Sequence, residues 1–200
     1  MKKIHYIPLG TRCSSAFVIR DNIKKREKSL PFDWLDMPLT AISNFVSIKH
    51  EDISNFTEKY FEEMGTAHIH SDGTWFPHDI EFVDNRYWAL KPDTKDKFTR
   101  RLKRLSETLS SEGFFVFLTT IIKNGKYQLE DFDRLKELLE EKVGKENCIF
   151  VTINLGEDKI NGNHYNYLVE ADPNDDGYKM WEKDITEKLK TAIEHFGGKI

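Results

Sequence analysis

The chain has 200 residues, of which 38% are hydrophobic and 12% aromatic, so one domain spanning 1–200 can bury a substantial core without metal or disulfide support. Its 30 basic and 34 acidic residues give a formal charge of -4, which provides no positive field for holding phosphate backbones. Nucleic acid is therefore disfavoured as the main partner.

The N-terminal half is predicted to begin with a strand and a helix. Apolar residues from Ile4 to Leu9 form the strand, and apolar spacing indicates a helix from about Ser14 to Ile23. Two further helices are expected at 39–48 and 53–64, the second capped by Asp52 or Ser54. Between them and the first helix, the Pro-Phe-Asp-Trp segment 31–34 is expected to be an extended loop or tight turn.

The C-terminal half alternates helices and strands. A hairpin at 67–76, turning at 71–74, comes first. Periodicity then predicts helices at 93–109, 129–143 and 178–196, with strands at 114–122, 148–154 and 165–170 and a polar turn between the last two strands. This alternation, with continuously apolar strands, predicts an α/β fold: a mainly parallel, Rossmann-like sheet with helices on both faces. The segment 30–91 is read as a helical and hairpin insertion covering one end of the sheet.

The two cysteines, Cys13 and Cys148, indicate a reducing compartment. The N-terminal apolar stretch is too short to span a membrane and has no small-residue cleavage site, so we expect a cytoplasmic protein. Cys13 is then a free thiol, with a Cys13–Cys148 disulfide as the alternative. Cys148 begins an apolar strand, which is typical of a small buried residue.

Cys13 is the predicted nucleophile because it lies where a strand turns into a helix. Unpaired N–H groups and the positive end of the helix dipole favour a thiolate there. His78 is the predicted base, since Pro77 fixes its approach and aromatic neighbours exclude water. Asp79 or Asp33 would orient the imidazole, although Asp33 can equally cap a turn and the His78-Asp79 pair can simply end a hairpin.

Four residues are predicted to contact a substrate. Gly10 and Ser14 flank the turn whose N–H groups can hold an oxyanion, Arg12 can hold an anionic group or pair with a surface carboxylate, and Trp34 can line a pocket or seal the insertion. The turn lacks the glycines of a dinucleotide motif and the lysine of a phosphate-binding loop, so no cofactor is expected. His68 and His70 share one face of a possible strand, but without a third ligand no metal is expected.

At these residues the chain resembles the putative papain-like cysteine peptidases, a family of bacterial and viral proteins. The resemblance covers roughly 4–155 and rests on Leu9-Gly10-Thr11-Arg12-Cys13, on Ala16 and Arg20, on Lys28-Ser29-Leu30-Pro31-Phe32-Asp33-Trp34, on His78-Asp79, on Arg100-Arg101 and on the strand Phe114 to Leu118. It implies that Cys13 is the nucleophile, His78 the base, Asp79 or Asp33 the orienting residue, and a peptide or other amide the substrate.

We therefore expect a cysteine-dependent hydrolase or acyl transferase acting on a peptide or small-molecule substrate, without a nucleic-acid or membrane partner. The alternative is a non-catalytic module on an α/β scaffold, in which Arg12, the Cys13 turn and Asp33 hold an anionic or sugar-like ligand. A third reading is an interaction protein whose aromatic insertion, with Trp34 and Trp75, docks a partner.

Overall fold

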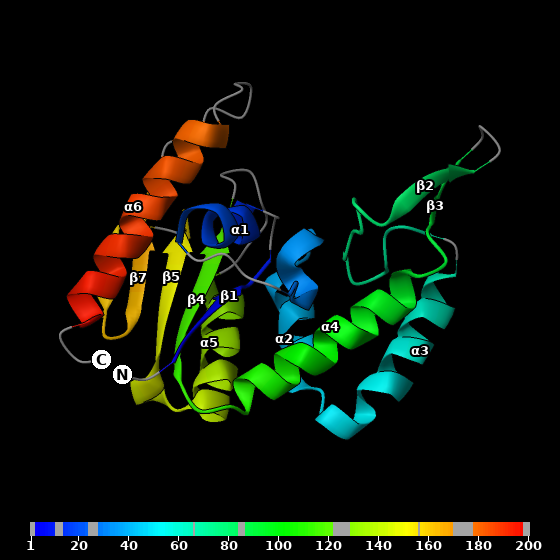
Figure 1. The fold of residues 1–200 in the computed structure, drawn as a ribbon, viewed down its shortest axis with the longest axis horizontal. Coiled ribbons are helices and arrows are strands. Elements are labelled where there is room, and N and C mark those ends of the chain that lie inside the picture. Colours follow the sequence, from blue (N-terminus) through cyan, green and yellow to red (C-terminus); the bar gives the residue numbers. More distant parts are fainter. Residues whose placement is uncertain are drawn as a thin grey trace.

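The computed structural model describes residues 3–10, 14–23, 28–65, 67–83, 87–121, 129–155, 157–169 and 178–197. Figure 1 shows a sheet flanked by helices on one side of the molecule and a helical part with a small hairpin on the other. In chain order the elements are β1 (Ile4–Pro8), α1 (Ser14–Phe17), the π-helix η1 (Val18–Ile23), the 3-10 helix η2 (Pro31–Trp34), α2 (Leu39–Ser47), η3 (His50–Asp52), α3 (Ile53–Met64), β2 (Ile80–Val83), β3 (Tyr87–Leu90), α4 (Thr94–Leu109), β4 (Phe114–Thr120), α5 (Leu129–Val143), η4 (Lys145–Asn147), β5 (Cys148–Ile153), β6 (Lys159–Asn161), β7 (His164–Tyr167) and α6 (Tyr178–Gly197).

The main sheet has the strand order β1-β4-β5-β7-β6. The first four strands of that order run parallel, and β6 pairs antiparallel with β7 at one edge. Every residue of β4 and β5 is buried, as expected for central strands covered on both sides. The predicted mainly parallel α/β fold is confirmed.

Alternate residues of these strands support two separate hydrophobic layers. Phe115, Phe117 and Phe150 face α2, α4 and α5. Val116 and Val151 face the opposite way and pack with Val18 and Ile19 of η1 and with Ile185, Leu189 and Ala192 of α6. Because side chains alternate across a strand, a continuous apolar run supplies both layers at once.

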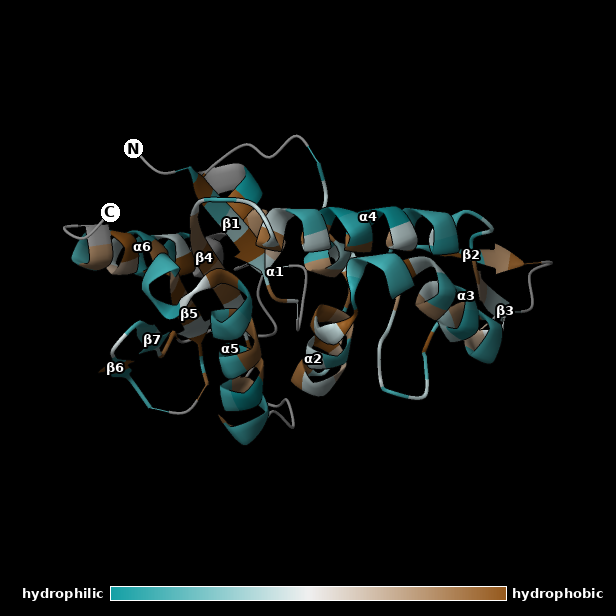
Figure 2. Cartoon of the chain, turned by 90° about the horizontal axis from the view of Figure 1, so that it is seen from below, coloured by the Kyte–Doolittle hydropathy of each residue, from teal (hydrophilic) through white to brown (hydrophobic). Residues whose placement is uncertain are grey.

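Much of the predicted insertion extends past the β1 edge of the sheet. In Figure 1, α2, α3 and the hairpin β2–β3 lie beyond β1, and α4 runs back from them toward the sheet. Figure 2 colours much of α4 hydrophilic, and its buried residues Phe98, Leu102 and Leu105 form a stripe at helical spacing. Buried residues of α2, α3 and α4 share one hydrophobic core with Phe115, Phe117 and Phe150 of the sheet.

Several elements differ from the sequence prediction. Residues 18–23 continue the first helix with π geometry. The hairpin predicted at 67–76 is reduced to a turn with an isolated bridge between Ile69 and Trp75. The hairpin β2–β3 and the strand β6 were not predicted; β6 is short and fully exposed, so it lacks an apolar alternation. Asp52 is the N-cap of α3 but makes no side-chain capping hydrogen bond.

Candidate functional site

The connections that follow β1 and β4 lead to opposite faces of the sheet. The helix after β1 packs in the layer with α6, whereas α5, the helix after β4, packs in the other layer. In open parallel sheets, ligands bind outside the carboxyl ends of two neighbouring strands whose connections diverge in this way. The fold therefore places the candidate site at the carboxyl ends of β1 and β4, where Gly10 and Thr120 lie.

The start of α1 is tied to the end of β4 by hydroxyl groups. Ser14 and Ser15 are buried, and their Oγ atoms lie 2.5 Å and 3.0 Å from Oγ1 of Thr120. Next to it, the Thr119 hydroxyl donates to the carbonyl oxygen of Leu9 at 2.5 Å. The candidate residues Arg12 and Cys13 belong to the segment 11–13, which joins Gly10 to Ser14 and lies outside the described residues.

The Pro-Phe-Asp-Trp segment forms η2 and packs directly on Gly10. A Cβ atom added to Gly10 would collide with the backbone carbonyl oxygen of Phe32, so this contact requires glycine. The Asp33 side chain is 1% exposed, and its carboxylate accepts the Leu30 N–H at 3.0 Å. The tight-turn prediction for this segment is confirmed and Asp33 acts as its cap, while the orienting role of Asp33 stays a prediction.

An aromatic cluster links His78 to α1. The Trp34 ring meets the edge of the His78 imidazole with ring centroids 5.5 Å apart, and it meets Phe17 of α1 at 5.4 Å, both nearly perpendicular. The Arg20 guanidinium lies over the rings of Phe17 and Trp34, at 4.8 Å and 5.5 Å from their centroids. The structure thus gathers the side chains of Phe17 and Arg20, of Trp34 and of His78 from three segments of the chain at one place.

His78 sits exposed on a turn that is held on both sides. Before it, Trp75 exchanges backbone hydrogen bonds with Asp36, and Phe76 is buried in the core. After it, the Lys91 Nζ donates to the His78 carbonyl oxygen at 3.3 Å. Among the described residues, the imidazole makes a ring contact with Trp34 and no hydrogen bond.

The Asp79 carboxylate is buried and faces α4. Its Oδ1 accepts from Lys97 Nζ at 3.3 Å, and its Oδ2 lies 3.8 Å from Nη1 of Arg101. The backbone oxygen of Asp79 accepts the Lys91 N–H at 2.9 Å and the Thr94 hydroxyl at 3.3 Å. These contacts fix the turn that carries His78, while the predicted direct orientation of the imidazole by Asp79 is not among the contacts of the described residues.

Sequence reasoning missed the role of α4. The basic residues 100–104 received no site role from the sequence, but Arg101 is only 17% exposed beside Asp79, and Arg104 donates to the Ser29 carbonyl oxygen. The i, i+4 spacing of Lys97 and Arg101 places both side chains on one face of the helix, and this was the available signal that they could share a partner. A second signal was the position of Thr120 at the end of the apolar run that forms the fully buried strand β4.

Of the predicted substrate-binding residues, Gly10 and Trp34 pack against other elements, and the Ser14 hydroxyl is bonded to Thr120. His70 is buried, stacks on Tyr60 with ring centroids 3.8 Å apart and has Nδ1 3.1 Å from Asp72 Oδ1. No cluster of three potential metal ligands occurs among the described residues.

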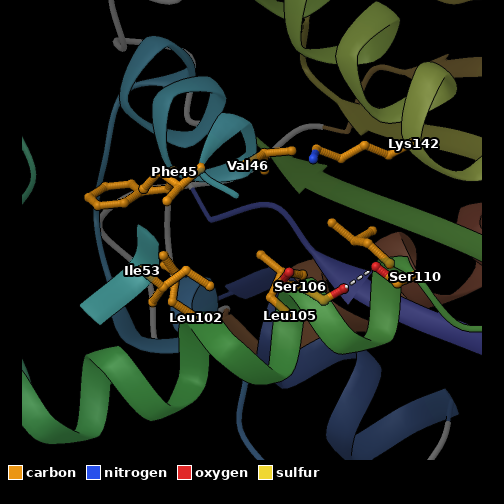
Figure 3. Close-up of a pocket in the computed structure, with 10 residues that line it drawn as sticks. Phe45, Val46, Ile53, Leu102, Leu105, Ser106, Ser110 and Lys142 are labelled. Atoms are coloured by element: carbon orange, nitrogen blue, oxygen red, sulfur yellow. Dashed lines mark hydrogen bonds between the residues drawn. The ribbon is translucent and has the colours of Figure 1, made fainter. Parts of the chain in front are cut away.

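A small pocket lies away from this site, between α2, α4 and α5. Its volume is about 70 Å³. Figure 3 shows the residues that line it, apolar ones such as Phe45, Leu102 and Leu105 together with Ser110 and Lys142. Its lining has no thiol, imidazole or carboxylate. The polar side chains of its lining are Ser106, Ser110 and Lys142, and the predicted site residues His78, Asp79 and Asp33 do not line it.

Cys148 is a free, fully buried thiol at the start of β5, as predicted. Burial raises the pKa of Cys148 to about 12. Such a thiol has almost no thiolate at neutral pH and is chemically inert in the folded protein. Cys13 lies outside the described residues, and its role as nucleophile stays a prediction.

No helix in the described ranges is both long and apolar enough to cross a membrane. A family model with the description "Putative papain-like cysteine peptidase (DUF1796)" matches residues 4–156, a range that contains every predicted site residue and ends after β5. No curated protein and no solved structure gives a significant match.

Proposed function

The chain belongs to the putative papain-like cysteine peptidase family, and on that premise we propose that it is a cysteine-dependent hydrolase acting on peptide or other amide bonds, with Cys13 as nucleophile and His78 as base. One observation supports this pairing above the others. The His78 imidazole contacts Trp34, and Trp34 contacts Phe17 in the helix that begins at the residue after Cys13. These contacts link His78 through Trp34 to Phe17, which lies 61 positions earlier in the sequence.

In the proposed reaction, the Cys13 sulfur attacks the substrate carbonyl carbon while His78 accepts the thiol proton. Backbone N–H groups at the start of α1, near Ser14 and Ser15, stabilise the oxyanion. His78 then donates the proton to the leaving amine, which departs as the thioester forms. Water, deprotonated by His78, hydrolyses the thioester and releases the acid and the free thiol.

The surroundings suit this chemistry in two respects. The first turn of α1 is held by hydroxyl bonds to Thr120, so its N–H groups are fixed in direction at the carboxyl end of the sheet. The His78 imidazole is exposed, which gives it access to the solvent water that deacylation requires. The proposal includes a cytoplasmic location, where a catalytic thiol stays reduced.

The test compares the alkylation of the two thiols by iodoacetamide at pH 6, with each site identified by peptide mass spectrometry. We expect Cys13 to react at least about tenfold faster than Cys148, because the Cys148 thiol is buried and its pKa is raised to about 12. His78→Ala should slow the reaction of Cys13, whereas His50→Ala, which removes another exposed histidine at η3, should not change it.

Equal and slow labelling of both thiols would contradict the hydrolase proposal. It would instead favour the non-catalytic binding module, with Arg12 and the Cys13 turn as ligand contacts. Rapid labelling of Cys13 that is unchanged in His78→Ala would keep the reactive thiol but refute His78 as its base.

A further inference from the structure

The hairpin β2–β3 exposes an unusual amount of aromatic surface. Phe82, Tyr87 and Trp88 are 49%, 50% and 52% exposed, although they lie within two four-residue strands. Figure 2 shows the hairpin at one end of the molecule, with hydrophobic colouring along β2. Exposed aromatic residues gathered in one place are typical of recognition surfaces.

The backbone of the hairpin also has an open edge. The Lys91 N–H donates to the Asp79 carbonyl, which makes this pair a hydrogen-bonded one just before the ladder of β2 and β3. In an antiparallel ladder such pairs alternate, so the N–H and C=O groups of Ile80 and Phe82 point outward. Neither residue makes a backbone hydrogen bond outside this hairpin to any other described residue.

An isolated two-stranded hairpin is marginally stable, and a third strand stabilises it. β2 begins two residues after His78, and the turn between them is fixed by the contacts of Asp79 to α4. A strand that paired with β2 would therefore be directed toward the proposed base. An extended peptide matches both the open backbone edge and the exposed aromatic surface of the hairpin. Its backbone can form hydrogen bonds with the edge of β2, and its alternate side chains can contact Phe82 and Trp88.

We infer that β2 and its aromatic residues bind an apolar, extended segment of the peptide substrate as an added strand beside the proposed site. This inference rests on the proposed function for its substrate. It assigns specificity to the hairpin: peptides with bulky apolar residues are preferred over small or charged ones, through contacts with Phe82 and Trp88. These two side chains already lie opposite each other, with ring centroids 5.1 Å apart.

The first experiment measures how fast Cys13 is alkylated by two iodoacetylated pentapeptides, one rich in Phe and Val and one made of Ser and Gly, relative to iodoacetamide. We expect the apolar peptide to react about tenfold faster than the polar one in the unsubstituted protein. The double variant F82A/W88A should lose this preference and keep its iodoacetamide rate. N-methylation of alternate amides in the apolar peptide should also remove the preference, because it blocks strand pairing.

The control is Ile160→Ala, which removes another exposed apolar side chain from β6 at the opposite edge of the main sheet. A second measurement follows the fluorescence anisotropy of a dye-labelled, acetylated and unreactive form of the apolar peptide while the protein is added. It reports binding even where Cys13 does not react, so failure of the hydrolase proposal and failure of the hairpin inference are distinguishable.

Equal rates for the two peptides, together with no anisotropy change, would overturn the inference. It would also be overturned if sedimentation showed a dimer that F82A/W88A dissociates, because the aromatic surface would then bind a second copy of the chain. Saturable binding that is lost in F82A/W88A and kept in Ile160→Ala would support it.

Discussion

The contact between Asp79 and α4 predicts how the His78 turn is held in place. Asp79 Oδ1 accepts a hydrogen bond from Lys97 at 3.3 Å, and the side chains of Asp79 and Lys97 are 9% and 29% exposed. A hydrogen bond to a charged group contributes about 1.5–3 kcal/mol to the free energy of unfolding. Lys97 keeps a second partner in Asp93 at 3.0 Å, so we expect Asp79→Asn to lower the free energy of unfolding by about 2 kcal/mol.

The assay combines urea unfolding with the pH profile of Cys13 alkylation. If Asp79 anchors the turn through α4, then Lys97→Gln and Arg101→Gln should each lower both stability and the alkylation rate, and combining either with Asp79→Asn should add little. Lys95→Gln is the matched control on the same helix. It breaks an exposed pair with Glu58, at 2.7 Å, and should change neither quantity.

The result that would refute this reasoning is specific. If Asp79→Asn changed the pH profile while Lys97→Gln and Arg101→Gln left stability and rate unchanged, Asp79 would act on the imidazole directly. That outcome would support the orienting role predicted from the sequence.

Two further predictions concern the partly buried His164 and the buried Thr120. The pKa of His164 is lowered to about 4, first by burial and then by Lys136, so the unfolded chain takes up a proton near pH 6.5 that the folded protein does not accept until about pH 4. The free energy of unfolding should therefore be highest above pH 6.5 and fall by about 2 kcal/mol as the pH drops from 6.5 to 4. His164→Gln should flatten this pH dependence in urea unfolding. An unchanged slope in the variant would contradict the role of His164. Thr120→Val keeps the side-chain shape but removes the hydrogen-bond partner of Ser14 and Ser15, so it should lower the free energy of unfolding by about 1–3 kcal/mol and slow Cys13 alkylation. The triple variant S14A/S15A/T120V should recover most of the stability, because it leaves no buried hydroxyl without a partner. No recovery would mean that the loss of these hydrogen bonds is not the cause.

The sequence was sufficient to predict the central strands β4 and β5 and the helices α4 and α5. The apolar runs 114–122 and 148–154 correspond to β4 and β5, and the periodic segments 93–109 and 129–143 correspond to α4 and α5. These patterns report burial on one or both faces, which is a local property of the chain. The hairpin β2–β3 was missed, although Ile80–Val83 and Tyr87–Leu90 are rich in strand-forming residues, because its exposed aromatic side chains do not produce a polar face.

The sequence by itself determined the fold class, the family resemblance and the chemical types at the candidate site, because strand and helix periodicity and short motifs are readable along the chain. Only the tertiary structure decided that His78 lies against Trp34, that Trp34 lies against Phe17, and that Asp79 faces Lys97 and Arg101. Those contacts join segments far apart in sequence, and their distances depend on how the layers pack around the sheet, which no local pattern encodes.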